Sequence, residues 1–368
     1  MIKLLSELIA MDSVFPNEAR MGEFLEQKLQ ELGFKTTRNY ISENRFNVLA
    51  EKGSGRRIML YGHMDTVPRY GDWHTDPFRL TEKDGRLYGL GAYDMKAGIA
   101  AILEACNSEN VENVKIAFGV DEENDSQGAY AITKSGFLDD VACVLVPEIS
   151  EISDERNGTN NIMLGRRGRA QYQIDIKGES AHAAFGNGVN AITEASKVAI
   201  EIERANPELP THEHLPKGNQ FVRKIFAESL SLSIPDCAKL IVDRQLVIPE
   251  NAETGRAHLQ QITNRITNKA NVTVVPRNVP YLMPYVTPQQ NEYVQKLAKI
   301  VEQQIGNLNH SYGHSPADEN LFAMQNLPVI SYGPIGSNQH SADEWVSKKS
   351  YLELIQILRA FLEQVSSY

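Results

Sequence analysis

A histidine and an aspartate stand two residues apart where a short apolar run ends. The run is "RRIMLY" (56–61), and "GHMDTVP" follows it with His63 and Asp65. An apolar run bounded by charges predicts a buried strand, and alternate residues of a strand point to the same face. A carboxylate in this position could orient a metal-binding histidine. The same pair could equally form a salt bridge at a strand end.

Glu122, Glu123 and Glu148 also stand where predicted strands end. Asp94 stands where a predicted helix begins, and a second histidine, His340, occurs late in the chain. Each has a structural alternative: Asp94 could cap a helix, Glu148 could be a surface charge, and the Glu122–Glu123 pair could lie in a solvated acidic loop. Several acidic groups at neighbouring strand ends would repel one another, and a cation would relieve that repulsion. Histidines with carboxylates suit zinc, cobalt or manganese, so the sequence favours a metal site.

The composition is that of an ordinary globular protein. The 368 residues include 37 Lys and Arg against 47 Asp and Glu, a net charge of −10, without a basic block. This charge balance disfavours a nucleic-acid partner and an anionic membrane partner, and we expect neither. Three scattered cysteines provide neither a disulfide framework nor a C-x-x-C pair. The charged, amphipathic N-terminus predicts neither a signal peptide nor a membrane span, so we expect a soluble cytoplasmic protein.

The order of predicted elements indicates two domains. Apolar strands alternate with helices over 1–163 and again over 280–368, which predicts an α/β domain with a mostly parallel sheet flanked by helices. Active groups of such sheets collect at the carboxyl ends of strands. Residues 164–279 instead show the order strand-helix-strand-strand-helix-strand, which predicts an inserted ferredoxin-like α+β domain. The alternating segment "GRAQYQIDIKG" (168–178) is expected to be an edge strand.

These motifs together resemble a known family. The segments "GHMDTVP", "WHTDPFRLTEKDGRLYGLGAYDMKAG", "DEEN", "VPE", "GESAHAA", "GVNAI", "DENLFA" and "NQHSADEWV" occur in family order between about residues 60 and 346. They are similar to the co-catalytic metallopeptidases that include glutamate carboxypeptidase, acetylornithine deacetylase, succinyl-diaminopimelate desuccinylase and aminoacylase. The resemblance implies a zinc-peptidase-like catalytic domain that carries a lid domain.

The resemblance also implies a metal centre with two divalent ions, of which zinc is expected first and cobalt or manganese are possible. His63 and Glu148 would bind one ion, Glu123 and His340 the other, and Asp94 would bridge both. A cis peptide would join Asp94 to the next residue. A water activated by the two ions would attack the substrate.

Two further acidic residues receive roles from the same resemblance. Glu122 would act as the general base that takes the proton of the attacking water. Asp65 would orient His63. Adjacent residues point in different directions, so Glu123 can bind metal while Glu122 faces the substrate.

The inserted domain contributes candidates of its own. His182, in "GESAHAA", would donate a hydrogen bond to the oxyanion, and in relatives this histidine often comes from the other subunit, which implies a homodimer paired through the lid. Arg244, in "LIVDRQL", could bind a substrate carboxylate or could pair with Asp243 or another neighbour. His212 and His214 could form a metal clip, although a solvated loop is the simpler interpretation.

The expected activity is metal-dependent hydrolysis of an amide bond next to a free carboxylate, in a small molecule or short peptide. An N-acyl amino acid deacylase or a carboxypeptidase would have this activity. The alternatives are an aminopeptidase or dipeptidase on the same scaffold and a non-catalytic relative that binds a ligand. The segments "FGNGVNAI" and "SLSLSIP" differ from the family pattern where substrate is recognised, which weakens any inference about substrate specificity. A nicotinamide enzyme is disfavoured because "GLGAYD" lacks the third glycine.

Overall fold

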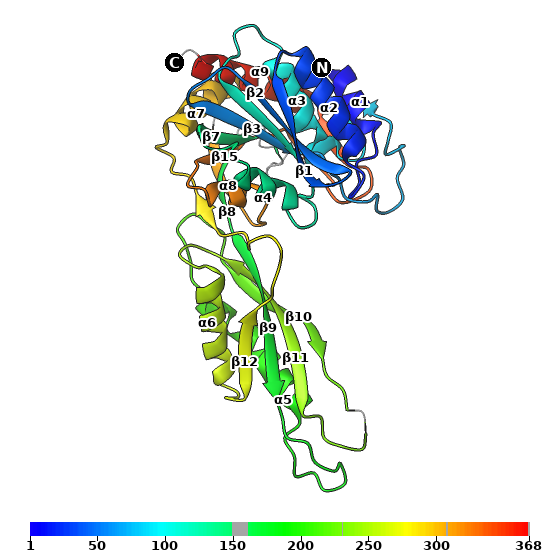
Figure 1. Cartoon of the computed structure of the whole chain (residues 1–368), viewed down its shortest axis with the longest axis vertical. Helices are drawn as coiled ribbons and strands as arrows, with labels where there is room; N and C mark the ends of the chain where they lie inside the picture. Colours follow the sequence, from blue (N-terminus) through cyan, green and yellow to red (C-terminus); the bar gives the residue numbers. More distant parts are fainter. Residues whose placement is uncertain (149–160, 230, 307, 367–368) are drawn as a thin grey trace. The chain divides into compact units, whose positions relative to one another are not determined.

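The computed structural model describes residues 1–148, 161–229, 231–306 and 308–366, and the chain divides into two compact units (Figure 1). The first unit comprises Met1–Gly165, Thr287–Gly313 and Ala317–Tyr368. The second comprises Arg166–Val286 and His314–Pro316. Each unit has a hydrophobic core of its own.

The first unit is organised around a large sheet with the strand order β1-β2-β6-β3-β7-β15-β8, in which β14 also pairs with β8. The central four strands are parallel: β6 (Val114–Gly119), β3 (Arg57–His63), β7 (Val141–Val146) and β15 (Val329–Ser331). Antiparallel strands flank them: β1 (Lys35–Ser42), β2 (Arg45–Lys52) and β8 (Asn161–Arg166). The strand that pairs with β8 off this path is β14 (Asn309–Gly313). All residues of β3, β6 and β7 are buried, which explains their continuous apolar sequences.

Helices pack around this sheet, with α3 and α9 side by side (Figure 1). They are α1 (Ile2–Ile9), α2 (Ala19–Glu31), α3 (Ala97–Cys106), α4 (Gln127–Lys134), α7 (Glu292–Gln304), α8 (Glu319–Ala323) and α9 (Lys348–Ser366). A small antiparallel sheet completes the unit: β16 (Gly336–Ser337), β17 (Trp345–Ser347), β5 (Arg86–Tyr88) and β4 (Thr81–Lys83).

One glycine of α3 brings this helix unusually close to the end of β7. A Cβ atom on Gly98 would lie 2.1 Å from the carbonyl oxygen of Pro147, so a larger residue would push the helix away. Asp94 precedes α3 and Glu148 follows Pro147, so this close contact also brings Asp94 near Glu148.

The second unit is an antiparallel sheet with two helices, in the strand order β10-β11-β9-β12. Its elements are β9 (Gly168–Lys177), α5 (Ala191–Arg204), a 3₁₀ turn (Asn206–Glu208), β10 (Asn219–Phe226), β11 (Cys237–Leu246), α6 (Ala252–Asn264) and β12 (Ala270–Val274), and β13 (Tyr285–Val286) ends it. The predicted α/β fold with an inserted ferredoxin-like unit is confirmed.

The prediction that residues 168–178 form an edge strand was wrong. β9 pairs with β11 on one side and β12 on the other, so the edges are β10 and β12. The alternation of β9 reflects a sheet with one face in the core and one face accessible, a pattern that interior and edge strands share. In the described part of the chain, none of the helices combines the length and the apolar character that crossing a membrane requires.

Candidate metal centre

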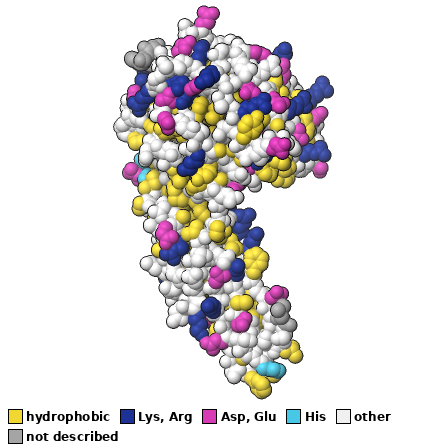
Figure 2. Space-filling view, in the orientation of Figure 1, with side chains coloured by type: hydrophobic (Ala, Val, Ile, Leu, Met, Phe, Trp, Pro, Cys, Tyr) yellow, Lys and Arg dark blue, Asp and Glu magenta, His cyan; other side chains and the backbone are white. Residues whose placement is uncertain are grey.

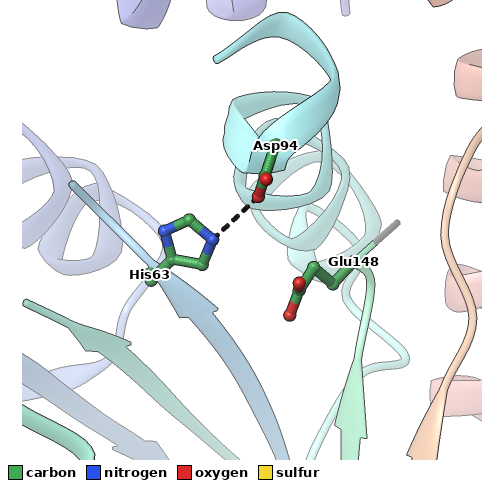
Figure 3. A group of neighbouring side chains, drawn as sticks. All are labelled: His63, Asp94 and Glu148. Atoms are coloured by element: carbon green, nitrogen blue, oxygen red, sulfur yellow. Dashed lines mark hydrogen bonds and ion pairs between the residues drawn. The ribbon is translucent and has the colours of Figure 1, made fainter. Parts of the chain in front are cut away.

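Two overlapping groups of histidine and carboxylate side chains lie in the first unit. The first consists of His63, Asp94 and Glu148, and the second of Asp94, Glu123 and His340. Within each group the candidate ligand atoms lie within 4.8 Å of one another. Figure 3 shows the first group, in which His63 at the end of β3, Asp94 before α3 and Glu148 after β7 converge.

The carboxylate of Asp94 is shared between the two groups. Its Oδ1 lies 3.1 Å from His63 Nε2, and its Oδ2 lies 3.3 Å from His340 Nε2. His340 Nε2 also lies 2.9 Å from Glu123 Oε1. Each oxygen of Asp94 thus faces a different histidine, which is the arrangement that a carboxylate bridging two cations needs.

The electrostatics of these groups favour positive charge. Hydrogen bonds to Asp94 and Glu123 raise the pKa of His340 to about 10. Burial alone would lower the pKa of His63, but the hydrogen bond to Asp94 and the nearby carboxylates raise it well above its usual value. Divalent cations would provide positive charge at the same place. Zinc, cobalt and manganese all bind sets of histidine and carboxylate ligands such as this one. The residues therefore fit a pair of such ions.

Asp94 is held in an irregular turn and is not a helix cap. It lies in a five-residue π-helical turn, Ala92–Lys96, with φ −117° and ψ 92°, and α3 begins only at Ala97. The peptide between Asp94 and Met95 is cis, as the family resemblance implied. The turn directs the carboxylate away from the helix and toward both histidines.

Asp65 contacts His63 through its main chain and the Glu122–Glu123 segment through its carboxylate. The Nδ1–H of His63 donates to the main-chain carbonyl of Asp65 at 3.0 Å, whereas the nearest carboxylate oxygen of Asp65 is 3.8 Å from that nitrogen. Since a carbonyl can only accept, this bond leaves the lone pair of His63 Nε2 available to a metal. The Asp65 carboxylate instead accepts the backbone N–H groups of Glu122 at 3.2 Å and Glu123 at 3.0 Å.

Glu122 follows β6 and belongs to neither group of candidate ligands. Burial, together with the charges of Glu148 and Asp318, raises the pKa of its carboxyl group well above the usual value, although His63 opposes the shift. An acidic residue with a raised pKa beside a metal centre is suited to taking and returning a proton.

His182 lies on the second unit, and its side chain is exposed. Its Nδ1 accepts the backbone N–H of Ala184 at 3.2 Å, so the proton of the neutral ring sits on Nε2. That nitrogen is therefore a hydrogen-bond donor, as the predicted role requires.

Arg244 is not available to a substrate carboxylate in this structure. It is fully buried in the second unit, and its guanidinium forms an ion pair with Glu250. Nη1 also donates to Gln220 Oε1 at 3.1 Å, and Nη2 lies 3.0 Å from His258 Nδ1. Of the two alternatives for Arg244, the structure favours pairing with a neighbour, and that neighbour is Glu250 and not Asp243.

Replacement of Arg244 by Met is expected to destabilise the protein by roughly 3–5 kcal/mol, because Glu250 would be left buried without its partner. Urea unfolding would measure the loss, and the double variant R244M/E250Q should recover part of it. Wild-type stability together with a raised KM for a carboxylate substrate would contradict this structural assignment.

The histidine pair at 212 and 214 forms a turn. His212 Nδ1 accepts the backbone N–H groups of His214 at 3.2 Å and Leu215 at 3.4 Å. Neither histidine joins a group of candidate metal ligands among the described residues. The geometry agrees with the interpretation as a solvated loop.

Two buried acidic residues near the site had received no role from the sequence. Asp318 is fully buried and accepts a hydrogen bond from Tyr61, and burial raises the pKa of Asp318 to about 7. Glu344 is also buried. Asp318 lies in the family motif "DENLFA" and Glu344 in "NQHSADEWV". Their position in these motifs is the sequence signal that could have pointed to a role at the site.

Comparison with known proteins defines the class. The model of peptidase family M20/M25/M40 matches residues 59–364, so the chain belongs to this family, and it is a metal-dependent hydrolase. The family that the motifs predicted is confirmed.

Individual relatives agree with this assignment over their whole length. The chain is 24% identical to a succinyl-diaminopimelate desuccinylase of Nitratiruptor sp., over 98% of this chain and 99% of the relative. Among solved structures, aminopeptidase PepT of Bacillus cereus has a TM-score of 0.78 at 19% identity, over 99% of this chain and 97% of that one. The Bacillus subtilis YXEP protein, described as a dinuclear metal-binding peptidase, has a TM-score of 0.77 at 14% identity, over 100% and 97%. At these identities the structural likenesses show the fold.

Proposed function

We propose that this protein hydrolyses an amide bond next to a free carboxylate, as an N-acyl amino acid deacylase or a carboxypeptidase. The observation that carries the proposal is the Asp94 carboxylate, whose two oxygens face His63 and His340 separately. The full-length similarity to a desuccinylase, whose name denotes removal of an acyl group from an amino acid, supports the deacylase form.

Two divalent ions would be held by the residues of the two groups, and zinc is the ion we expect first. His63 and Glu148 would bind one ion, Glu123 and His340 the other, and Asp94 both. When bound, such a pair lowers the pKa of a water molecule between the ions and polarises the substrate carbonyl.

The remaining steps are assigned to side chains of this protein. Glu122 would accept the proton of the attacking water and deliver it to the leaving amine, and such transfer contributes typically about 10²–10⁴-fold to the rate. Asp65 would keep Glu122 and Glu123 in place through the backbone N–H groups that it accepts. Nε2–H of His182 would donate to the oxyanion.

We further propose that the protein is a homodimer paired through the second unit, with His182 acting in the partner's site. The support is an exposed apolar surface on the edge strand β10, where Phe221 is 43% exposed, Ile225 52% and Phe226 53%. Figure 2 shows hydrophobic side chains among the charged ones on the visible face of this unit. Edge strands with exposed apolar residues are usually covered by a partner. Location in the cytoplasm remains a prediction.

One alternative has an observation in its favour. The fold is shared with an aminopeptidase over nearly the whole of both chains, so an aminopeptidase or dipeptidase activity on the same scaffold stays the second candidate. A non-catalytic binding protein is disfavoured because the described residues include every predicted ligand and the predicted base.

A substrate panel distinguishes these candidates. The apoprotein, prepared with a chelator, is expected to be inactive and to regain activity with zinc, cobalt or manganese. N-succinyl, N-acetyl and N-formyl amino acids are then compared with dipeptides that have a free amino group, each beside its carboxyl methyl ester. Hydrolysis of the acylated acids but not of their esters would support the proposal. Turnover of the free-amino peptides alone would favour the aminopeptidase, and no turnover with any metal would favour a binding protein.

A further inference from the structure

A buried carboxylate connects the segment that carries His340 to the turn that carries Asp94. Glu344 stands four residues after His340 and is 2% exposed. Its Oε2 accepts the backbone N–H of Gly91 at 2.8 Å. Its Oε1 accepts those of Tyr93 at 2.8 Å and Asp94 at 2.9 Å.

These backbone groups need an external acceptor because they precede the first turn of α3 and sit in an irregular stretch. A carboxylate has only acceptors, with about four lone-pair directions on its two oxygens, so one side chain can accept all three hydrogens. Its negative charge is also favourable near a helix N-terminus. Lys96, fully buried on the same turn, provides a counter-charge and donates to the Met11 carbonyl at 2.9 Å.

Glu344 is itself firmly anchored. Its main-chain carbonyl accepts the N–H of Gly89 at 3.1 Å. The next residue, Trp345, begins β17 and pairs with Tyr88 of β5. The main chain of Glu344 is thus fixed by the small sheet, while its carboxylate accepts hydrogen bonds from the turn that carries Asp94.

We infer that Glu344 is a positioning residue of the metal centre, which fixes the turn of Asp94 relative to the segment of His340 so that both groups of ligands keep their spacing. The inference rests on the proposed metal assignment, since Asp94 is the ligand common to both groups. A competing explanation is that Glu344 merely stabilises the start of α3. That role would affect the unfolding temperature and leave the metal affinity of the folded protein unchanged.

The substitution E344Q separates the two explanations. Glutamine keeps the shape but has one acceptor oxygen, so an amide group must face at least one of the three N–H groups. We expect the affinity for zinc, measured by calorimetry well below the unfolding temperature, to fall about 10–100-fold, as for other residues that orient metal ligands. The visible spectrum of the cobalt-loaded protein should change as well. The milder variant E344D keeps the charge but shortens the reach, and it should lose affinity to a smaller degree.

A matched control is E250Q, which alters another buried glutamate, in the second unit, where it pairs with Arg244. It should lower the unfolding temperature and leave zinc affinity at the wild-type level. Wild-type zinc affinity in both Glu344 variants, or an equal loss in E250Q, would overturn the inference while leaving the metal centre itself intact. Absence of zinc binding in the wild-type protein would overturn the metal assignment and this inference together.

Discussion

Replacement of Glu122 by Gln is expected to leave two metal ions bound while kcat falls about 10²-fold or more. Glutamine cannot accept the proton of the attacking water. Glu122 stands outside both groups of candidate ligands, so the metal sites should keep their composition. Metal analysis of the purified variant, together with kcat on the best substrate of the panel, would test the expectation.

The neighbouring glutamate provides the matched control for this experiment. E123Q removes a charge next to Glu122, but Glu123 Oε1 lies 2.9 Å from His340 Nε2 within the second group. We therefore expect E123Q to lose metal as well as activity. If E122Q loses metal in step with activity and E123Q does not, the roles of the two residues must be exchanged.

The candidate ligands could be predicted from the sequence because the strands that carry them have strong local signals. β3, β6 and β7 are continuous apolar runs, and neighbouring parallel strands present their carboxyl ends at one edge of a sheet. The candidate ligands His63 and Glu148 follow directly from that rule, and so does the proposed base Glu122, which belongs to neither ligand group. The family motifs supplied the roles and also His340, whose surroundings carry no such signal.

The positioning contacts could not be predicted in the same way. Asp65 meets the backbone of Glu123 across 58 positions of sequence, and Glu344 meets that of Asp94 across 250. Hydrogen bonds from a side chain to a distant backbone leave no periodicity in the sequence. The partner of Arg244 could not be predicted from sequence adjacency, because consecutive residues of a strand point to opposite faces, so Arg244 and Asp243 cannot face each other. Asp243 instead pairs with Arg169, 2.6 Å away.

Replacement of His182 by Ala is expected to lower kcat about 10²–10³-fold, as loss of one oxyanion donor does in other hydrolases. Zinc affinity should hardly change, because His182 is absent from both groups of ligands. Metal titration and steady-state kinetics of H182A test these two expectations. A loss of metal affinity that matched the loss of rate would contradict the role of an oxyanion donor.

Mixing two inactive variants tests whether His182 acts across a dimer. E122Q lacks the base and H182A lacks the donor, so neither homodimer is active. After subunit exchange, a mixed dimer contains one site with both an intact Glu122 and an intact His182 from the partner. Half of the dimers are mixed and each has one such site of two, so about a quarter of the wild-type activity should return.

A control mixture shows whether the recovered activity has this origin. H63A and E122Q both damage the first unit, and His63 and Glu122 of one site come from the same chain. Their mixed dimers contain no intact site, so no activity should return. If ultracentrifugation shows a monomer, or if exchange is demonstrated and the mixture of E122Q and H182A stays inactive, His182 does not act in the partner's site. Recovery in the mixture of E122Q and H182A, but not in the control mixture, requires that the second unit of one chain supplies the oxyanion donor to the active site of the other, because no other combination of these chains joins an intact base to an intact donor.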